Sequence, residues 1–347
     1  MTRAGTTADH DVPGQDTDGR TGTLRRRAGQ VPAPVLALSS AVVLVVAVLA
    51  LAVRFGVAEV GQAVVDGARL GLVLALVGMG LSLVLATTGV FNFAHGEFAT
   101  LGALTAWFLN AHGAPLWLAV AAAVPIGALA GVASERGVWR PLRRRRVSLV
   151  SVLVVGIGLG LATRSLFLFF LGGSARTYSD YAVQSPVHLL GVAIAPKSVV
   201  GGLVCLLALA ALGLFLTRTR TGQRVRAVAD DPSLAAASGI AVDRVLAAVW
   251  VIGGGLAALG GALLGLSEQV SWDMGNQVLL LVIAGVTLGG LGSVTGAAVG
   301  GLLVGVLTQL GVLFLPAELK YVTALALLVL ILLVRPSGLF GRRERVG

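Results

Sequence analysis

The sequence predicts an all-α membrane protein, a polytopic transmembrane helical bundle of about ten spans, some of which can be broken or re-entrant. Three observations predict it. Hydrophobic residues make up 56% of the 347 residues and charged residues only 12%, whereas a soluble domain carries about 25% charged residues. Glycine, which is more frequent in spanning helices than in soluble ones, occurs 48 times. Long apolar runs recur along the chain, so most of the outer surface must face lipid.

Each apolar run is expected to form one helix. A helix needs about 20 apolar residues to cross the hydrocarbon core of a bilayer, and backbone groups in lipid must be hydrogen-bonded within the protein. In chain order, the expected spans are residues 34–53, 62–86, 94–110, 114–134, 148–171, 196–217, 244–266, 278–292, 296–315 and 318–334.

Arginine clusters predict the orientation of these spans. Cytoplasmic loops carry an excess of Lys and Arg, and an even number of expected spans separates each cluster from the next. The pattern predicts a multi-pass protein of the plasma membrane with both termini in the cytoplasm. It also accounts for the net charge of +10 without nucleic acid as a partner. The clusters lie within residues 25–27, 136–146, 218–226 and 335–345.

The two ends of the chain differ from its middle. Residues 1–33 are largely polar and are expected to form a disordered cytoplasmic tail. Residues 34–58 are expected to add an N-terminal transmembrane helix and a short external loop, and residues 342–347 a cytoplasmic C-terminal tail. Cys205 is the one cysteine of the chain, which excludes an intrachain disulfide.

Two breaks between apolar runs, residues 87–96 and 289–296, lack the arginine clusters of other cytoplasmic turns. Interrupted segments at corresponding positions of two halves point to a translocation site. The first break carries Asn92, His95 and Glu97, and polar groups are costly in hydrocarbon unless they are paired. These side chains either line the solute path, or form a structural network that holds the next helix against the preceding span. One His and one Glu do not make a metal site, so no metal is predicted.

Arg164 and a glycine series stand out within the spans. Arg164 lies in the outer half of the fifth span, where its head either snorkels outward or lines the pore and meets a solute carboxylate. Gly292, Gly296 and Gly300 recur every four residues. This spacing predicts one glycine face on a helix, where helix backbones can approach closely.

The longest polar segment between spans on the predicted cytoplasmic side is residues 217–244. An amphipathic run at residues 223–229 predicts a short helix. Pro232 can open a second short helix, and Gly239 would end it. Two short helices along the membrane face make a protein-docking surface, and the alternative is a plain connector. The external segment 172–195 leaves the same choice between a solvated connector and a dock for a solute-delivering partner.

Five short pieces occur in a fixed order along the chain. On these pieces, the chain resembles the branched-chain amino acid permease family of ATP-binding-cassette importers, over roughly residues 59–341. The pieces are Gly-Val-Phe-Asn-Phe-Ala-His-Gly-Glu at 89–97, Glu-Arg-Gly-Val-Trp-Arg-Pro-Leu at 135–142, the polar segment 220–244, Leu-Gly-Gly-Leu-Gly-Ser at 288–293, and Arg-Pro-Ser-Gly-Leu-Phe-Gly at 335–341.

The resemblance implies a permease domain over residues 59–341 that works with separate subunits. The segment 217–244 would dock on ABC ATPase subunits, and an external solute-binding protein and a second related permease subunit would complete the importer within membrane lipid. The chain has no G-x-x-x-x-G-K-[ST], which also favours ATP hydrolysis by a partner. No catalytic residue and no cofactor is predicted. The residues implied for ATPase coupling are Gly222, Arg226, Asp230, Asp231 and Gly239.

Departures from the family pattern bear on the solute. Thr295 stands where the family usually has Pro, and residues 162–165 differ from the polar residues often seen in the fifth span. Branched-chain amino acids or a related small polar solute are the first expectation, and urea or short amides are the alternative within the family. A secondary transporter or channel would instead show flux from the purified chain alone. An integral membrane enzyme is not expected, because no nucleophile–base set is found.

Overall fold

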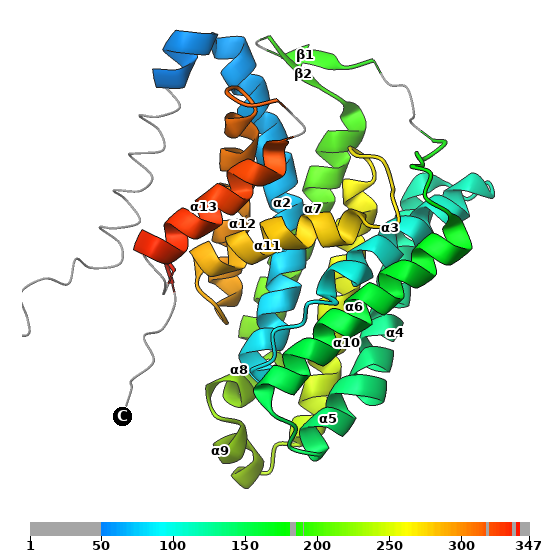
Figure 1. Cartoon of the computed structure of the whole chain (residues 1–347), viewed down its shortest axis with the longest axis vertical. Coiled ribbons are helices and arrows are strands. Elements are labelled where there is room, and N and C mark those ends of the chain that lie inside the picture. The colour runs from blue at the N-terminus through cyan, green and yellow to red at the C-terminus, as the bar shows by residue number, and fades with distance from the viewer. Residues whose placement is uncertain (1–49, 181–184, 190, 317–318, 335–337, 341–347) are drawn as a thin grey trace, which may run out of the picture. The chain divides into compact units, whose positions relative to one another are not determined.

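The computed structural model of the chain describes residues 50–180, 185–189, 191–316, 319–334 and 338–340, all within the compact unit Leu44–Gly347. These residues form a bundle of helices with one small hairpin (Figure 1), which confirms the predicted all-α class. The main helices are α2 (Val57–Thr88), α3 (His95–Ala111), α4 (Leu116–Ser134), α6 (Leu149–Leu171), α7 (Pro196–Arg218), α10 (Val242–Leu264), α11 (Met274–Gly289), α12 (Val294–Gly311) and α13 (Lys320–Val334).

Short elements gather at the two ends of the bundle. At one end lie α5, α8 and α9, and at the other lies a two-stranded hairpin (Figure 1). The arginine clusters that follow α4 and α7 therefore share one end, as the charge pattern predicted. The short elements are the π-helix η1 (Glu135–Trp139), α5 (Arg140–Arg144), α8 (Arg220–Asp230), α9 (Pro232–Ala237), β1 (Val187–Leu189) and β2 (Val192–Ile194).

Nine of the ten expected spans each overlap one helix of the described residues. The remaining span, residues 34–53, lies almost entirely outside the described residues. Within the described residues, six helices are long and apolar enough to cross a membrane: α2, α4 with its extension to Arg144, α6, α7, α10 and α12. The helices α3 and α11 have 17 and 16 residues, which is short of the roughly 20 that a full crossing needs.

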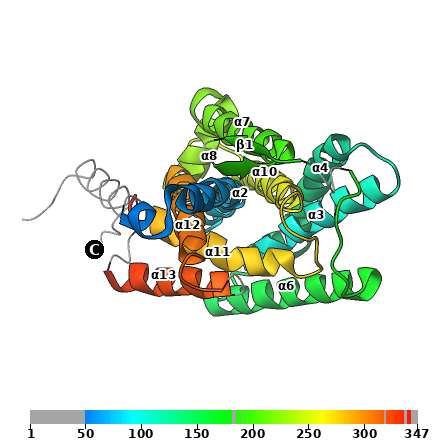
Figure 2. The same cartoon turned by 90° about the horizontal axis from the view of Figure 1, so that it is seen from above.

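The centre of the bundle is formed by α2 and α10, which pack against each other, with α12 on α2 and with α3 and α4 on α10 (Figure 2). Glycine makes these contacts close. A Cβ on Gly102 would lie 2.0 Å from the carbonyl oxygen of Ala258, and one on Gly261 would lie 1.9 Å from that of Ala99. No side chain fits between these backbones, so the packing requires glycine at both positions.

Two helices lie at the margins of the bundle. In the most apolar stretch of α6, and likewise of α7, only 17% of the residues are buried. Seen from above, α7 lies on one side of the central helices, and α6 and α13 lie on the opposite side (Figure 2). Their large exposed apolar side chains, such as Leu161 and Leu207, are suited to lipid or to another membrane subunit.

The segment between α6 and α7 is anchored to the bundle. Strands β1 and β2 pair antiparallel, with Val187 opposite Ile194. Arg176 exchanges backbone hydrogen bonds with Val270, and its guanidinium stacks 4.0 Å above the Trp107 ring. The buried Tyr178 hydroxyl donates to the Ala262 carbonyl over 2.8 Å. These contacts fix part of the segment 172–195. The sequence alone had allowed this segment to be either a solvated connector or a docking site for a partner.

Candidate functional site

The break between α2 and α3 turns the chain back into the bundle. Gly89 ends α2 in the left-handed conformation, at φ 67°, and its N–H donates to the Leu85 carbonyl over 2.9 Å. His95, the first residue of α3, places its Nε2 3.2 Å from the Val77 carbonyl oxygen. Val77 lies three turns inside the Thr88 end of α2, about 16 Å at 1.5 Å per residue. The helix α3 therefore starts deep within the bundle, and the first break is re-entrant.

A glycine face on α6 supports this re-entrant segment. A Cβ on Gly156 would lie 3.7 Å from the Phe93 nitrogen, and one on Gly160 would lie 3.4 Å from the Ala94 Cα. The spacing of four residues puts both glycines on one side of the helix. The backbone that leads to α3 can therefore rest directly on α6.

Asn92 and His95 are both fully buried where the segment meets α2. Asn92 Oδ1 accepts a hydrogen bond from the Ala94 N–H over 3.0 Å, and the His95 ring meets Phe98 edge to face. Within the described residues, Asn92 Nδ2 and His95 Nδ1 are buried without a hydrogen-bond partner. The contacts present support the structural alternative for these two residues, since they hold the start of α3 against α2.

Glu97 of α3 and Arg164 of α6 are ionisable side chains that interact electrostatically across the two helices. Glu97 is 4% exposed, and the Thr100 hydroxyl donates to Glu97 Oε2 over 3.4 Å. Arg164 is partly buried, and Asp273 also interacts electrostatically with Glu97. None of the ion pairs within 4 Å found in the described part of the chain includes Arg164, Glu97 or Asp273. The three groups are thus coupled without a direct ion pair between them.

Asp273 interacts electrostatically with Glu97, although the sequence analysis did not single it out. It lies at the N-cap position of α11, and its carboxylate accepts hydrogen bonds of 2.9 Å from both Ser271 Oγ and Gln277 Nε2. Gln277 in turn accepts from the Tyr321 hydroxyl of α13 over 3.0 Å. Asp is a preferred N-cap residue, so a helix start at residue 274 rather than 278 could have been inferred.

At the opposite end, a second group of residues builds a surface from α8 and α9. Thr219 Oγ1 accepts from the Gly222 N–H over 2.9 Å and so caps α8. A Cβ on Gly222 would lie 2.1 Å from the Phe215 carbonyl oxygen, so only glycine fits at the joint between α7 and α8. Val225 and Val228 of α8 are buried against the bundle, whereas Arg226 is exposed. The predicted amphipathic helix is therefore present, with its basic face free of the bundle.

Asp231 separates the two short helices. Asp231 Oδ1 accepts from the N–H groups of Ser233 and Leu234, at 2.8 Å and 3.0 Å, and caps α9 as Pro232 opens it. The hydrogen bonds from the Ser233 hydroxyl and then from these two N–H groups lower the pKa of Asp231. Gly239 follows α9 with φ +81°, the left-handed conformation that ends many helices. The exposed Asp230 is the last residue of α8.

The glycine series at the α11–α12 turn is only partly as predicted. Gly296 and Gly300 do lie on one face of α12, where their backbones contact Gly289 and Gly285 of α11. Gly292 does not join them, because it lies before α12 in the turn and has φ +78°. It packs near Ala86, close to the Thr88 end of α2. The second break is thus a tight turn at the end of the bundle rather than a segment that re-enters it.

Two pieces of the chain that are remote in sequence meet at this turn. The N–H of Leu339 donates to the Leu288 carbonyl over 2.7 Å, and the N–H of Phe340 donates to the Gly289 carbonyl over 3.0 Å. Gly338, with φ +69°, lies against the Thr287 carbonyl and Gly290. The described end of the chain therefore satisfies carbonyls at the C-terminus of α11.

The piece at 135–142 forms the junction between α4 and α5. The π-helix η1 ends at Trp139, whose fully buried ring stacks on Trp250 of α10 with centroids 5.7 Å apart. The buried Glu135 carboxylate pairs with Arg143, and Arg140 pairs with Asp243 at 2.6 Å. These contacts tie the arginine-rich end of α4 to the start of α10.

Comparison with known proteins agrees with this arrangement. A model of the family described as "Branched-chain amino acid transport system / permease component" matches residues 63–334. The permease protein LivH of a high-affinity branched-chain amino acid transport system in Salmonella typhimurium is 33% identical over 307 residues, covering 82% of this chain and 96% of LivH.

Other relatives include a second branched-chain amino acid permease and a permease named for a sugar. The corresponding permease protein BraD of Pseudomonas aeruginosa is 31% identical over 82% of this chain and 96% of its own length. The fructose import permease protein FrcC of Rhizobium meliloti is 29% identical over 67% of this chain and 66% of its own length. No solved structure matches the chain. The chain belongs to the branched-chain amino acid permease family, whose members are the membrane-spanning permease subunits of ATP-binding-cassette importers rather than enzymes.

Proposed function

We propose that this permease subunit moves branched-chain amino acids or a related small zwitterion across the plasma membrane. The observation that carries the proposal is the grouping of the ionisable side chains of Glu97, Arg164 and Asp273, none of which is in an ion pair within 4 Å in the described residues. A zwitterion offers a carboxylate that Arg164 can bind and an ammonium that the two acidic side chains can bind. The names of LivH and BraD support this solute class. Asn92 and His95 hold the beginning of α3 and so position Glu97.

The energy comes from separate ATPase subunits that dock on α8 and α9. Gly222 and Gly239 set the directions in which these helices enter and leave, Asp230 and Asp231 lie at their junction, and Arg226 faces outward for the partner. The end of the bundle that carries them is cytoplasmic, and the hairpin end, with residues 172–195, receives an external solute-binding protein. Both termini are then cytoplasmic, although residues 1–49 and 341–347 lie outside the described residues.

A second related permease subunit completes the solute path by packing against α6. The outward face of α6 is apolar and largely exposed in the single chain, for example at Val154 and Ile157. Arg164 lies on the same helix. With the solute held between two subunits, charges at the edge of this chain would lie at the centre of the transporter. The permease domain then spans residues 59–341, with 34–58 as an added N-terminal segment.

Substituting Arg164 tests the solute site. In cells that express the chain with its partner subunits, Arg164→Gln should raise the leucine concentration for half-maximal uptake about tenfold or more. A charge-assisted hydrogen bond contributes about 1.5–3 kcal/mol, and 1.4 kcal/mol corresponds to tenfold in affinity. The ATPase activity without solute should stay at its normal level. Arg54→Gln is the matched control, because Arg54 is exposed and stacks on Phe55 outside the path.

Two results would contradict the proposal. Equal leucine uptake by Arg164→Gln and wild type would remove the carboxylate-binding role, and competition of uptake by urea or a short amide but not by leucine would move the solute to that class. Flux through the purified chain alone in liposomes, without ATPase subunits, would instead favour a secondary transporter or channel.

A further inference from the structure

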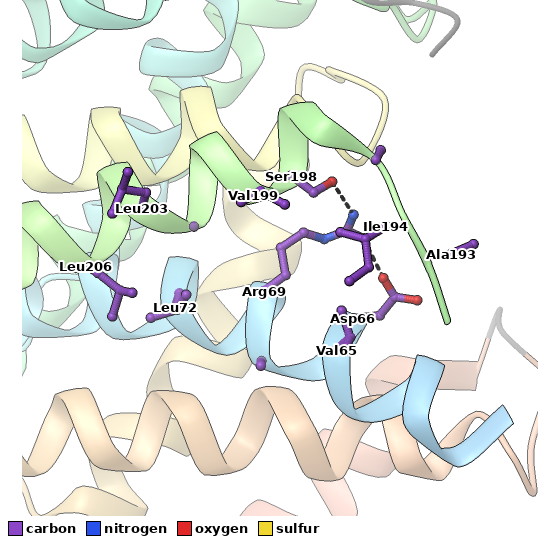
Figure 3. Close-up of a pocket in the computed structure, with 13 residues that line it drawn as sticks. Val65, Asp66, Arg69, Leu72, Ala193, Ile194, Ser198, Val199, Leu203 and Leu206 are labelled. Atoms are coloured by element: carbon purple, nitrogen blue, oxygen red, sulfur yellow. Dashed lines mark hydrogen bonds and ion pairs between the residues drawn. The ribbon is translucent and has the colours of Figure 1, made fainter. Parts of the chain in front are cut away.

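A cavity of about 380 Å³ lies between α2 and α7, on the side of the bundle away from α6 and α13 (Figures 2 and 3). At its mouth are the polar side chains of Asp66, Arg69 and Ser198, and its walls are apolar, with Leu72, Leu203 and Leu206 among them. None of these residues belongs to the solute path or to the coupling surface.

The polar side chains at the mouth of the cavity form a network of hydrogen bonds and an ion pair. Arg69 lies between the two helices, where Nη1 donates to Ser198 Oγ over 2.9 Å and Nη2 lies 3.3 Å from Asp66 Oδ1 (Figure 3). Gln62 Nε2 donates to Asp66 Oδ2 over 2.9 Å and also bonds the backbone of Ala193 in strand β2. The side chains of Arg69 and Asp66 are 32% and 31% exposed. Arg69 therefore keeps N–H donors free, beside an accessible carboxylate.

The apolar part of the cavity follows α7 into the membrane. Leu203 and Leu206 are 55% and 53% exposed, and Leu206 lies about 12 Å along the helix from Ser198, at 1.5 Å for each residue step. Gly202 lies in the cavity wall, where an added Cβ would come 3.7 Å from Leu72 Cδ1. Glycine at this position keeps the space between the helices open. The cavity thus joins a headgroup-sized polar mouth to a groove that fits an acyl chain.

We propose that this cavity binds a zwitterionic phospholipid of the leaflet next to the β hairpin. The lipid phosphate binds Arg69, its ammonium binds Asp66, and one acyl chain lies along Leu72, Leu203 and Leu206. Charge complementarity favours this occupant, because a zwitterionic headgroup offers an ammonium for Asp66 as well as a phosphate for Arg69, whereas an anionic headgroup would compete with Asp66 for Arg69 and offer Asp66 no cation in return. An apolar helix of a partner subunit would cover the Arg69–Asp66 ion pair and remove its water, but would offer no polar groups to offset that desolvation cost.

Native mass spectrometry of the full purified chain tests the proposal. The chain is titrated with phosphatidylethanolamine and, separately, with phosphatidylglycerol of the same acyl chains. We expect the wild type to bind phosphatidylethanolamine more tightly, and Gly202→Leu to weaken that binding about tenfold by filling the groove. Asp66→Asn should shift the preference toward phosphatidylglycerol. Gly213→Leu is the matched control on the same helix, since a Cβ there meets nothing within 4 Å.

Three outcomes would overturn the proposal. Equal phosphatidylethanolamine binding by Gly202→Leu and Gly213→Leu would show that the cavity is not the site. A wild-type preference for phosphatidylglycerol would remove the zwitterionic selectivity. Loss of the bound lipid when the chain is assembled with its partner subunits would assign the groove to a partner helix.

Discussion

Single glycines decide how closely the helices of this protein approach. A Cβ on Gly96 would lie 2.4 Å from the carbonyl oxygen of Gly275, so the starts of α3 and α11 touch through their backbones. Glu97 and Thr100 lie on this same stretch of α3, and the Gly275 N–H donates to Thr100 Oγ1 over 3.0 Å. The close contact therefore positions polar groups of the proposed solute path.

Gly96→Ala is expected to destabilise the protein by about 1–3 kcal/mol, the usual cost of overpacking a close contact. Gly158→Ala is the control on α6, since a Cβ there meets nothing within 4 Å and Ala favours a helix more than Gly does. Thermal unfolding of both variants in one detergent gives the comparison. Equal melting temperatures for the two variants would refute the requirement for glycine at residue 96.

The cap at Asp231 should depend on pH. Its pKa is lower in the folded chain than the ordinary value near 4, so the cap stabilises α9 at neutral pH and is lost as the pH falls through the folded-state pKa. Hydrogen exchange of residues 232–237 should accelerate in that acidic range, relative to the intrinsic rate. Asp231→Asn should abolish this pH dependence and Asp230→Asn should keep it; the reverse pattern would assign the titration to the other carboxylate.

At the scale of elements, the proposed coupling surface of α8 and α9 has a glycine at each end. The backbone of Gly222 lies against Phe215 and Leu216 at the end of α7, while Gly239, with φ +81°, sets the exit after α9. A non-glycine residue in the left-handed conformation costs about 1–2 kcal/mol. Both ends of the coupling surface therefore depend on glycine, for steric reasons at residue 222 and for conformational reasons at residue 239.

Gly222→Val is expected to uncouple ATP hydrolysis from transport, because the added side chain must displace α8 from α7. Gly239→Asp should do the same through backbone strain, and the amount of membrane-inserted protein should stay near normal in both variants. Uptake and ATPase activity of the assembled transporter, with Gly213→Val as control, give the readout. Normal uptake in both variants would count strongly against docking at α8 and α9.

Elements set by local sequence were predictable, and contacts between remote pieces were not. The two short helices at residues 220–237 follow from an amphipathic run and from the Asp231–Pro232 pair. Gly292 was misplaced because a four-residue spacing cannot show where a helix starts. Asp273 was missed because its nearness to Glu97 depends on how α3 and α11 pack. The meeting of residues 338–340 with 288–290 depends on the tertiary fold, and no periodicity within one segment signals it.

At the scale of the whole molecule, the arginine-rich elements that the charge pattern assigns to the cytoplasm lie together at one end of the bundle. The arginine-rich elements α5 and α8 share one end of the bundle and the hairpin forms the other (Figure 1). Ser174 is exposed near the hairpin end, and Ser238 is exposed after α9. Chemistry at these two residues can report which end faces the cytoplasm.

A cysteine placed at each position should therefore react from opposite sides. In intact spheroplasts, a membrane-impermeant maleimide should label Ser174→Cys, and it should label Ser238→Cys only after permeabilisation. The natural Cys205 is 1% exposed and serves as the unlabelled background. Labelling of Ser238→Cys in intact spheroplasts would reverse the topology and remove the ATPase from α8 and α9.

The backbone bonds from Leu339 and Phe340 to the end of α11 have a consequence for truncation. Residues 338–340 follow α13 in the chain, so α11 and α12 are synthesised before the segment that closes the turn between them. A protein cut short just before Gly338 would keep every helix that the structure describes and would lose the N–H donors to the Leu288 and Gly289 carbonyls. Its turn between α11 and α12 should then be cut by added protease faster than the same turn in the full chain.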